Sequence, residues 1–249
     1  TSKPFIPWRL DDIPAKHILH CNIIKKQEVE QLFSQFQFKT IFDLAAYGAY
    51  SKQSDVELIH ETNYTGLLHL LETASRYSVK AFIHAGSSSE YGLNCVAPKE
   101  SDELLPNSHY AVTKASAAHM IKFYGTIKEM PVLNLRYYSV FGAYEEPDRL
   151  IPTLIKKALQ QEFPPLVQPE ISRDFVYVDD AVLATLMAAN SNFSQTAGKS
   201  INIASGIKTT IRDIANTAKQ VFNIPGEPHW GDFPNRKWDL KDWYGDASL

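Results

Sequence analysis

Short apolar runs alternate with amphipathic stretches over most of the chain. The apolar runs predict strands, and they cover Lys16–Ile23, Thr40–Ala45, Ala81–Ala85 and Val132–Tyr137. The stretches between them have apolar residues at helical spacing, and they cover Lys26–Phe36, Asp55–Tyr77 and Tyr110–Lys128. Strands that alternate with helices in this way predict an α/β fold with a doubly wound parallel sheet.

The regular alternation of strand and helix patterns ends after Phe141. Prolines divide the next segment into short pieces, and they stand at Pro147, Pro152, Pro164, Pro165 and Pro169. Further along, Asp179–Ala189 predicts a helix and Ser200–Ala204 predicts a strand that returns to the main sheet. The regular alternation therefore ends near Phe141 and resumes before Asp179.

Composition and charge exclude several classes of protein. The 249 residues can bury a full core, and a net charge of -3 without a basic cluster argues against a nucleic-acid surface. No apolar run approaches the roughly 20 residues of a membrane helix. The two cysteines, Cys21 and Cys95, form neither a disulfide framework nor a Cys-x-x-Cys pair, so we expect a reducing, cytoplasmic setting. The histidines and acidic residues form no metal-ligand pattern, so no metal site is expected.

Candidate chemistry lies after the strand Ala81–Ala85 and at the start of the helix Tyr110–Lys128. Ser87 follows the strand, and Tyr110 and Lys114 stand at i and i+4 on one helix face. A nearby ammonium favours the phenolate, so we expect Lys114 to lower the pKa of Tyr110 from about 10 towards neutrality. A serine hydroxyl beside such a tyrosine predicts general acid–base chemistry on an alcohol or a carbonyl.

Further motifs follow in a fixed order around these residues. They are Asp43-Leu44-Ala45-Ala46, Asn63-Tyr64-Thr65-Gly66, Gly86–Gly92, His109–Lys114, Leu135–Gly142, Ser172–Asp180, Ile201–Gly206 and Asn235–Asp239. In this combination the chain resembles an extended short-chain dehydrogenase/reductase of the NAD-dependent sugar-nucleotide epimerase/dehydratase family. The resemblance covers nearly the whole chain, and it implies a Rossmann-type sheet with a smaller C-terminal substrate domain.

The resemblance implies a role for individual residues. Ser87, Tyr110 and Lys114 would be catalytic, with NAD as the cofactor and NADP as the alternative. The residues at cofactor-binding positions are Ala45, Ala46, Asn63, Tyr110, Lys114 and Tyr137. The residues at positions that contact a nucleoside-diphosphate sugar are Ser88, Ser89, Ser139, Arg173 and Arg236. Asn63 could also be a helix cap, and the two arginines could form surface ion pairs.

Departures from the family pattern restrict which of the family's reactions we expect this chain to catalyse. Ser88 and Ser89 stand where 4,6-dehydratases carry Asp-Glu, and serine cannot replace those acid and base groups at neutral pH. Glu90 is one place further along, where a strand-like backbone would direct it to the other face. Ser139 stands where the family usually has an asparagine that contacts the substrate. The resemblance therefore does not indicate which sugar this chain recognises. We therefore expect an epimerase or a 4-ketoreductase, with a 4,6-dehydratase as the alternative.

The family's opening strand and glycine-rich turn have no counterpart in the sequence. The glycines form no Gly-x-x-Gly-x-x-Gly pattern, so we expect a cofactor domain over 1–142 and 173–206 that lacks this start. The substrate domain would cover 143–172 and 207–249. A shortened, non-catalytic binding or scaffold protein is the alternative. In this family, the helices that correspond to Asp55–Tyr77 and Tyr110–Lys128 usually form a homodimer interface. The alternative for this chain is that the apolar residues of these helices pack only on the sheet.

Overall fold

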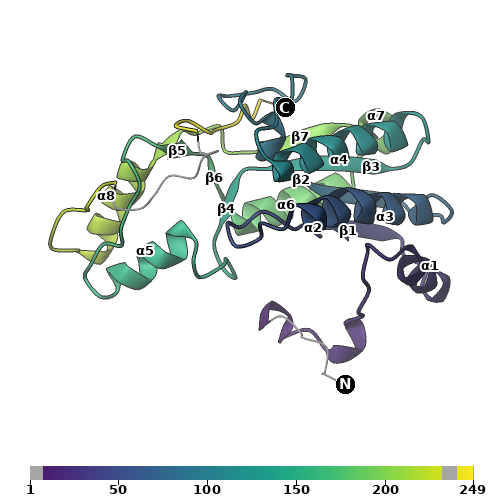
Figure 1. Cartoon of the computed structure of the whole chain (residues 1–249), viewed down its shortest axis with the longest axis horizontal. Coiled ribbons are helices and arrows are strands. Elements are labelled where there is room, and N and C mark those ends of the chain that lie inside the picture. The colour runs from purple at the N-terminus through teal and green to yellow at the C-terminus, as the bar shows by residue number, and fades with distance from the viewer. Residues whose placement is uncertain (1–7, 232–239, 249) are drawn as a thin grey trace.

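A parallel four-stranded sheet forms the centre of the molecule (Figure 1). A computed structural model describes residues 8–231 and 240–248. The sheet has the order β1-β2-β3-β7, and every neighbouring pair is parallel. Its strands are β1 (Thr40–Asp43), β2 (Ala81–Ser87), β3 (Val132–Tyr137) and β7 (Ser200–Ile203). The predicted α/β fold with a Rossmann-type parallel sheet is therefore confirmed.

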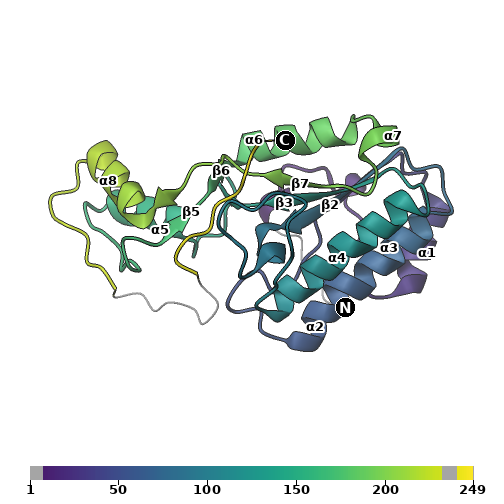
Figure 2. The ribbon, with the colours of Figure 1, turned by 90° about the horizontal axis from the view of Figure 1, so that it is seen from above.

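Helices cover both faces of this sheet (Figure 2). One face carries α1 (Lys26–Gln35), α3 (Leu67–Ala74) and α4 (His109–Thr126). The other face carries α6 (Val178–Ala189) and α7 (Phe193–Thr196). The remaining helices of the sheet region are η1 (Trp8–Leu10), η2 (Ala15–His17), α2 (Val56–His60), η3 (Glu61–Gly66) and η4 (Ser88–Tyr91).

A smaller group of elements lies beyond the carboxyl ends of the strands (Figures 1 and 2). Its helices α5 (Leu150–Ala158) and α8 (Ile211–Phe222) pack together through Leu154, Ala158 and Ala218. Its strands are β4 (Ser139–Phe141), β5 (Ser172–Arg173), β6 (Phe175–Tyr177) and β8 (Thr209–Thr210). They form two short ribbons, β4 with β6 and β5 with β8.

Alternating side chains of the strands fill two separate cores. Phe82 and Val132 face α3 and α4, where they pack with Leu71 and Ile121. Ile83 and Leu133 face the other way and pack with Ala181 and Ala188 of α6. Because both faces are covered, most positions of the central strands β2 and β3 are buried and many of them are apolar. His84, Asn134 and Arg136 are buried polar exceptions.

A π-helical turn interrupts the long helix predicted over Asp55–Tyr77. Asp55 caps its start by accepting a hydrogen bond from the Leu58 amide (3.1 Å). The turn η3 then joins α2 to α3 without a break in the chain's direction. Such turns insert one extra residue into a helix and often occur near functional sites.

The strand predicted over Lys16–Ile23 is wrong. The chain makes only the short turn η2 at Ala15–His17 and then continues without regular structure to α1. Leu19 is 51% exposed, and among the described residues no strand pairs with this segment. An apolar run forms a strand only where a neighbour accepts its backbone hydrogen bonds, and that neighbour is not visible in the run itself.

Asp174 links the smaller group of elements to the sheet through hydrogen bonds of its carboxylate. Its buried carboxylate accepts hydrogen bonds from the Ser205 amide (2.8 Å) and hydroxyl (2.7 Å) and from the Gly206 amide (3.0 Å). The Gly245 amide donates to the same carboxylate (3.2 Å). Three segments that are distant in sequence therefore meet at one side chain.

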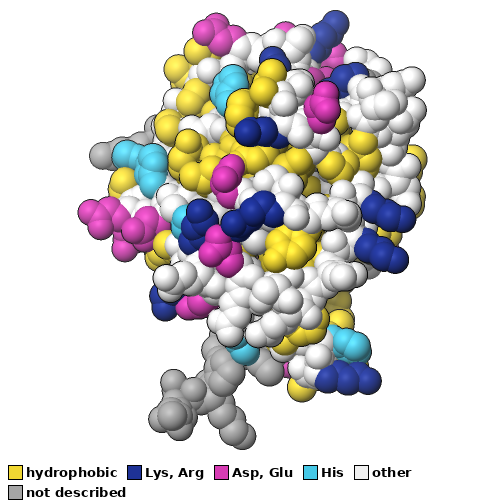
Figure 3. Space-filling view, turned by 90° about the vertical axis from the view of Figure 1, so that its right-hand side faces the viewer, with side chains coloured by type: hydrophobic (Ala, Val, Ile, Leu, Met, Phe, Trp, Pro, Cys, Tyr) yellow, Lys and Arg dark blue, Asp and Glu magenta, His cyan; other side chains and the backbone are white. Residues whose placement is uncertain are grey.

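The end of the molecule farthest from α5 and α8 has a mixed surface. Basic and acidic side chains are scattered there among apolar and neutral ones (Figure 3). Within 8–231 and 240–248, no helix combines the length and the apolar character that crossing a membrane would require.

Candidate active site

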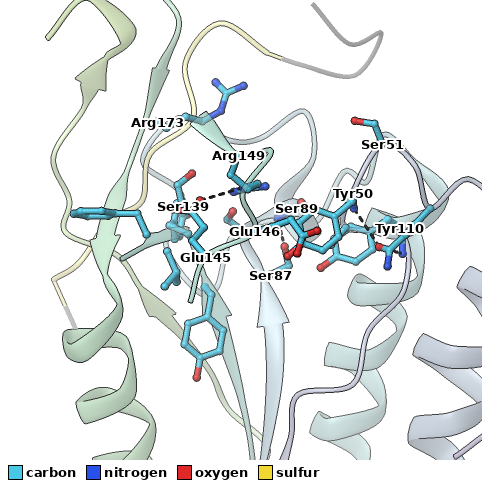
Figure 4. A pocket seen from close by; sticks show the side chains of 18 of the residues that line it. Tyr50, Ser51, Ser87, Ser89, Tyr110, Ser139, Glu145, Glu146, Arg149 and Arg173 are labelled. Atoms are coloured by element: carbon cyan, nitrogen blue, oxygen red, sulfur yellow. Dashed lines mark hydrogen bonds and ion pairs between the residues drawn. The ribbon is translucent and has the colours of Figure 1, made fainter. Parts of the chain in front are cut away.

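A cavity of about 910 Å³ lies at the carboxyl ends of β2 and β3 (Figure 4). The loop 48–51, the turn 86–89 and the start of α4 line one side of it. The segment 137–149 lines the other side. Parallel sheets of this kind bind ligands at the carboxyl ends of their strands, which makes this cavity the candidate active site.

A tight turn holds the hydroxyl of Ser87 in the cavity wall. Ser87 is the last residue of β2, and its Oγ accepts a hydrogen bond from the Ser89 amide (3.1 Å). The Glu90 carboxylate accepts one from the Ser87 amide (2.9 Å), which completes a capping box. The serine is therefore fixed through its side chain and through its backbone.

Glu90 turns away from the cavity and into the interior. It is completely buried, and its carboxylate accepts hydrogen bonds from Asn134 Nδ2 (3.1 and 3.2 Å) and Arg136 Nε (2.6 Å). The sequence predicted this direction for a strand-like backbone, whereas the residue lies in the 3₁₀ turn η4. Glu90 thus supports the serine turn from behind.

Tyr110 lies across from this turn, at the start of α4, and it lines the same cavity as Ser87. Burial raises its pKa to about 12, and the Ser87 hydroxyl acts against this increase by interacting with the phenol. The prediction that Lys114 lowers the pKa of Tyr110 is wrong for the structure as described. The Lys114 ammonium instead donates to the Ala85 carbonyl (2.7 Å), on the sheet side of the helix.

Lys114 is almost completely buried beneath Tyr110, at 1% exposure. Burial lowers the pKa of Lys114, while the carboxylates of Asp43 and Glu90 raise it. The hydrogen bond to Ala85 uses one of its three N–H groups, which leaves donors for a hydroxylated ligand. Lys114 does not line the cavity itself.

A buried hydrogen-bonded pair, His84 and Asp43, lies next to Lys114. His84 Nδ1 and Asp43 Oδ2 are 2.7 Å apart, and both side chains are almost fully excluded from solvent. Burial lowers the pKa of His84, and the Lys114 ammonium lowers it further, while Asp43 acts in the opposite direction. The neutral imidazole is therefore favoured, with its Nδ1 hydrogen donated to Asp43.

Asn63 is not a helix cap, because it lies inside the π-helical turn η3. It is buried, and its amide accepts a hydrogen bond from the Tyr47 amide (2.8 Å) and donates to the Tyr47 carbonyl (2.8 Å). It also donates to Thr113 Oγ1 (3.0 Å). Asn63 therefore holds the loop after β1 against α4, and its contact with a cofactor stays a prediction.

The other predicted cofactor residues are divided between the cavity and its surroundings. Ala45 and Ala46 are exposed in the loop after β1 and do not line the cavity. Tyr137 lines it from the end of β3, and its hydroxyl lies 2.5 Å from Thr185 Oγ1. The cavity therefore brings together only part of this predicted set.

Most of the predicted substrate residues do line the cavity. Ser88 and Ser89 do so from η4, Ser139 from β4 and Arg173 from β5. The Arg173 guanidinium donates to the carbonyls of Ser172 (2.7 Å) and Leu240 (3.2 Å). Arg236 lies outside the described residues.

The sequence reading missed the loop between β4 and α5. Glu145, Glu146 and Arg149 line the cavity from this loop, and Arg9 joins them from η1. Their signal was a run of charged residues, Glu145-Glu146-Pro147-Asp148-Arg149, directly after the motif Leu135–Gly142. Polar side chains that follow a strand end in an α/β sheet are candidates for ligand contacts.

The hydrogen-bond donors of the site, which are the Lys114 ammonium and the hydroxyls of Ser87 and Tyr110, suit a cofactor with a ribose better than they suit a metal ion. A buried ammonium with available donors, next to a serine and a tyrosine hydroxyl, can bind a sugar diol and exchange a proton with an alcohol. In the part of the chain that the structure describes, no cluster of three or more His, Cys, Asp or Glu side chains could hold a metal ion.

Comparison with known proteins agrees with this chemistry. The family described as the NAD dependent epimerase/dehydratase family matches residues 3–204. An uncharacterised UDP-glucose epimerase of Bacillus subtilis is 28% identical over 173 residues, which cover 68% of this chain and 54% of that protein. In general, the chain spans about half the length of the curated relatives it matches.

Solved structures resemble the chain over most of its length. UDP-glucose 4-epimerase of Thermotoga maritima with UDP-glucose has a TM-score of 0.81 and 28% identity, and the match covers 91% of this chain and 74% of that chain. UDP-glucuronic acid 4-epimerase of Bacillus cereus with UDP-glucuronic acid and NAD has a TM-score of 0.78 and 26% identity. The match covers 91% of this chain and 71% of that chain.

Proposed function

The chain belongs to the NAD dependent epimerase/dehydratase family, and from this premise we propose that it is an NAD-dependent enzyme that oxidises and reduces one carbon of a nucleotide sugar. The observation that supports this most directly is the meeting of Ser87 and Tyr110 in one cavity, with the Lys114 ammonium directly behind them. Relatives that bind UDP-glucose, or UDP-glucuronic acid and NAD, support the class of substrate and the cofactor.

Each of the three residues has a role in the proposed reaction. Tyr110 takes the proton from a sugar hydroxyl and returns it to the carbonyl oxygen. Ser87 holds that oxygen by a hydrogen bond, because its own hydroxyl is fixed by the turn η4. Lys114 binds the ribose next to the nicotinamide through the N–H groups that Ala85 does not use. Bound NAD would supply the hydride acceptor and donor.

Tyr110 must lose its proton before it can act as a base, and its raised pKa opposes this. Positive charge next to a phenol lowers its pKa. Arg149 already acts in this direction, and a cationic group bound beside the tyrosine would add to the effect. The unliganded site therefore keeps Tyr110 protonated, and the loaded site would activate it.

The product would be a C4 epimer or a reduced sugar. Ser88 and Ser89 line the cavity without a carboxyl group, and Glu90 is buried behind them in contact with Arg136, which favours epimerisation or reduction over loss of water. The test is to incubate the purified protein with NAD or NADPH and a panel of nucleotide sugars, and to identify the products by chromatography and NMR.

Each product class points to one reaction. An epimer formed with catalytic NAD supports the epimerase, and stoichiometric oxidation of NADPH by a keto sugar supports the reductase. A product that has lost one water would support the alternative 4,6-dehydratase. A protein that binds neither cofactor nor nucleotide sugar would contradict the enzyme proposal and favour the scaffold.

The protein would act as a homodimer through α3, α4 and the turn η3. Tyr64 and Phe123 are 43% and 45% exposed on the outer side of these elements, beside a hollow of about 560 Å³. An exposed apolar surface of this kind is typical of an interface between subunits. Light scattering of the eluting protein would test this, and a monomer at micromolar concentration would contradict it.

We also propose a cytoplasmic location. Cys21 and Cys95 are both free thiols, and burial raises the pKa of each, so neither is poised to react. Thiols that form no disulfide are typical of proteins in reducing compartments. Fractionation of cells that express the protein would test the location, and recovery outside the cytoplasm would contradict it.

A further inference from the structure

Lys114 is a buried cation that has no carboxylate in contact with it. The residue is 1% exposed, and its ammonium donates a hydrogen bond to the Ala85 carbonyl at 2.7 Å. No carboxylate within 8–231 and 240–248 forms an ion pair with this ammonium. A buried charge is unfavourable unless an opposite charge lies near enough to offset it.

Two buried carboxylates act on the Lys114 ammonium from different elements. Burial lowers the pKa of Lys114, whereas Asp43 at the end of β1 and Glu90 in η4 raise it. Glu90 already accepts a hydrogen bond from Arg136 Nε at 2.6 Å, so the Arg136 charge offsets it. No lysine or arginine of the described residues forms an ion pair with Asp43, whose side chain contacts the ring of His84 instead. Asp43 is therefore the carboxylate whose charge remains to offset that of Lys114.

The strands place Asp43 beside the point where the Lys114 side chain ends. Asp43 on β1 is in register with His84 on β2, so the two side chains point to the same face of the sheet. This is the face under α4, because Phe82, two positions before His84, packs in the core that α4 covers. Lys114 extends from α4 and reaches the carbonyl of Ala85, which is the residue after His84.

His84 holds the Asp43 carboxylate in place without neutralising it. His84 Nδ1 and Asp43 Oδ2 are 2.7 Å apart, and the two side chains are 1% and 3% exposed. Burial lowers the pKa of His84, so the ring is neutral and the pair as a whole keeps one negative charge. The Ala45 amide donates to Asp43 Oδ1 (3.3 Å) and fixes the other oxygen. The carboxylate is thus held where solvent does little to offset its charge.

We propose that Asp43 is a positioning residue that acts as the counter-charge of Lys114 and keeps this lysine in its ammonium form. The buried charges under α4 then balance in two pairs. Asp43 offsets Lys114, and the second pair is Glu90 with Arg136. An ammonium has three N–H groups, so two remain beside the bond to Ala85 and can donate to the hydroxyls of a ribose. This use of the ammonium rests on the proposed function, whereas the role of Asp43 does not.

The other titratable groups that face Lys114 are uncharged at neutral pH. They are His84 on β2 and Tyr110 on the same helix as Lys114. Burial lowers the pKa of His84 and raises that of Tyr110 to about 12. A change in the titration of Lys114 just above neutral pH therefore reports on the carboxylates around it.

The test follows the charge of Lys114 directly, by NMR of protein that carries carbon-13 at the lysine Cε atoms. Loss of one signal in Lys114→Arg assigns the resonance. Asp43→Asn removes the negative charge with little change in shape, and it should raise the acid dissociation constant of Lys114 about tenfold or more. Asp43→Glu keeps the charge and should restore most of the wild-type value. Asp180→Asn is the matched control and should change the constant less than about twofold, because Asp180 is exposed on α6, over the other face of the sheet.

The titration can contradict the proposal in two ways. An acid dissociation constant of Lys114 that Asp43→Asn leaves unchanged would overturn it. If Asp43→Asn does not fold, the double variant of Asp43→Asn with Lys114→Met decides. The double variant should fold, because it leaves neither charge buried alone. A double variant that also fails to fold would overturn the pairing of these two charges.

Binding of NAD separates this inference from the proposed function. Calorimetry between about pH 6 and 10 measures the affinity of the wild type and of Asp43→Asn for NAD. The affinity of the variant should fall at lower pH than that of the wild type, because a neutral Lys114 has one donor fewer. Equal pH profiles would overturn the link between the counter-charge and the cofactor. A protein that binds no NAD at any pH would contradict the proposed function, while a Lys114 titration that responds to Asp43→Asn would still support Asp43 as the counter-charge.

Discussion

Arg136 Nε donates to the Glu90 carboxylate at 2.6 Å, in the interior directly behind the turn that carries Ser87. Arg136 also donates through Nη1 to the Tyr91 hydroxyl (2.7 Å) and to the Glu100 carbonyl (3.1 Å). The candidate catalytic serine is thus supported by a buried charge pair that joins η4 to β3. Stability and activity are linked at this point of the fold.

Glu90→Ala should destabilise the protein strongly. It leaves the buried Arg136 guanidinium without its partner and the Ser87 amide without its acceptor, so the free energy of unfolding should fall by about 3–5 kcal/mol. Urea denaturation measures this. Glu162→Ala removes an exposed ion pair instead and should cost less than about 1 kcal/mol. Equal losses for the two variants would contradict the role of the buried pair.

Tyr110→Phe should lower turnover by about 10³-fold, because it removes the acid–base group and little else. The affinity for the nucleotide sugar should stay within about threefold, since the ring remains in place. Steady-state kinetics and calorimetry measure the two effects. Tyr177→Phe removes a hydroxyl from a tyrosine that does not line the cavity, and it should keep full activity.

Ionisation of Tyr110 should occur only at high pH when no ligand is bound. Its pKa is raised to about 12, so the folded protein holds this proton more tightly than the unfolded chain, where tyrosine ionises near pH 10. Its contribution to stability is therefore fully present below about pH 10 and is lost as the pH rises towards 12. The phenolate absorbance of the wild type minus that of Tyr110→Phe should show no step below about pH 10.

His84 should make the protein less stable in mild acid. Its pKa is lowered in the folded state, so the unfolded chain takes up this proton more readily, and stability falls as the pH drops through about 6.5. Urea denaturation between about pH 5 and 8 should show a steeper fall for the wild type than for His84→Gln. The exposed His229 provides the control, and His229→Gln should follow the wild-type curve.

Gly125→Ala should separate α4 from the loop before β7. A methyl group at Gly125 would lie 2.1 Å from the Gly198 nitrogen, and both partners are backbone, so the cost should be about 1–3 kcal/mol or more. Gly226→Ala is the matched control, because nothing lies within 4 Å of its added methyl group. Thermal unfolding compares the two, and a similar melting temperature for both would contradict this close approach.

The sheet and its helices could be predicted because their signals are local. The strand at Ala81–Ala85 and the helix at Tyr110–Lys128 have the apolar pattern of buried elements, and they form β2 and α4. The segment Lys16–Ile23 has a similar pattern, but no strand of the described residues pairs with it, and it forms no strand. The domain boundaries stay a prediction.

The candidate site was only partly predictable, for a related reason. Ser87 and Tyr110 belong to short sequence motifs, and the local backbone conformation of each motif is determined by its own residues. These two residues could therefore be predicted from local sequence. The pair Glu145 and Arg149 depends on how the loop after β4 folds over the sheet, which no local pattern encodes. The pKa of Tyr110 was predicted in the wrong direction, because spacing on a helix shows that Lys114 is near but not that its ammonium points to Ala85.

The four hydrogen bonds to Asp174 determine how the cavity can respond to a ligand. They join β5 and β6 to the segments at Ser205 and Gly245, so the wall that carries Arg173 is assembled during folding. A diphosphate that contacts Arg173 would meet a surface whose described part is already held in place by these hydrogen bonds, so the cost of ordering that part would be small. Association at this side should therefore be fast, and differences in affinity between nucleotide sugars should appear mainly in their dissociation rates.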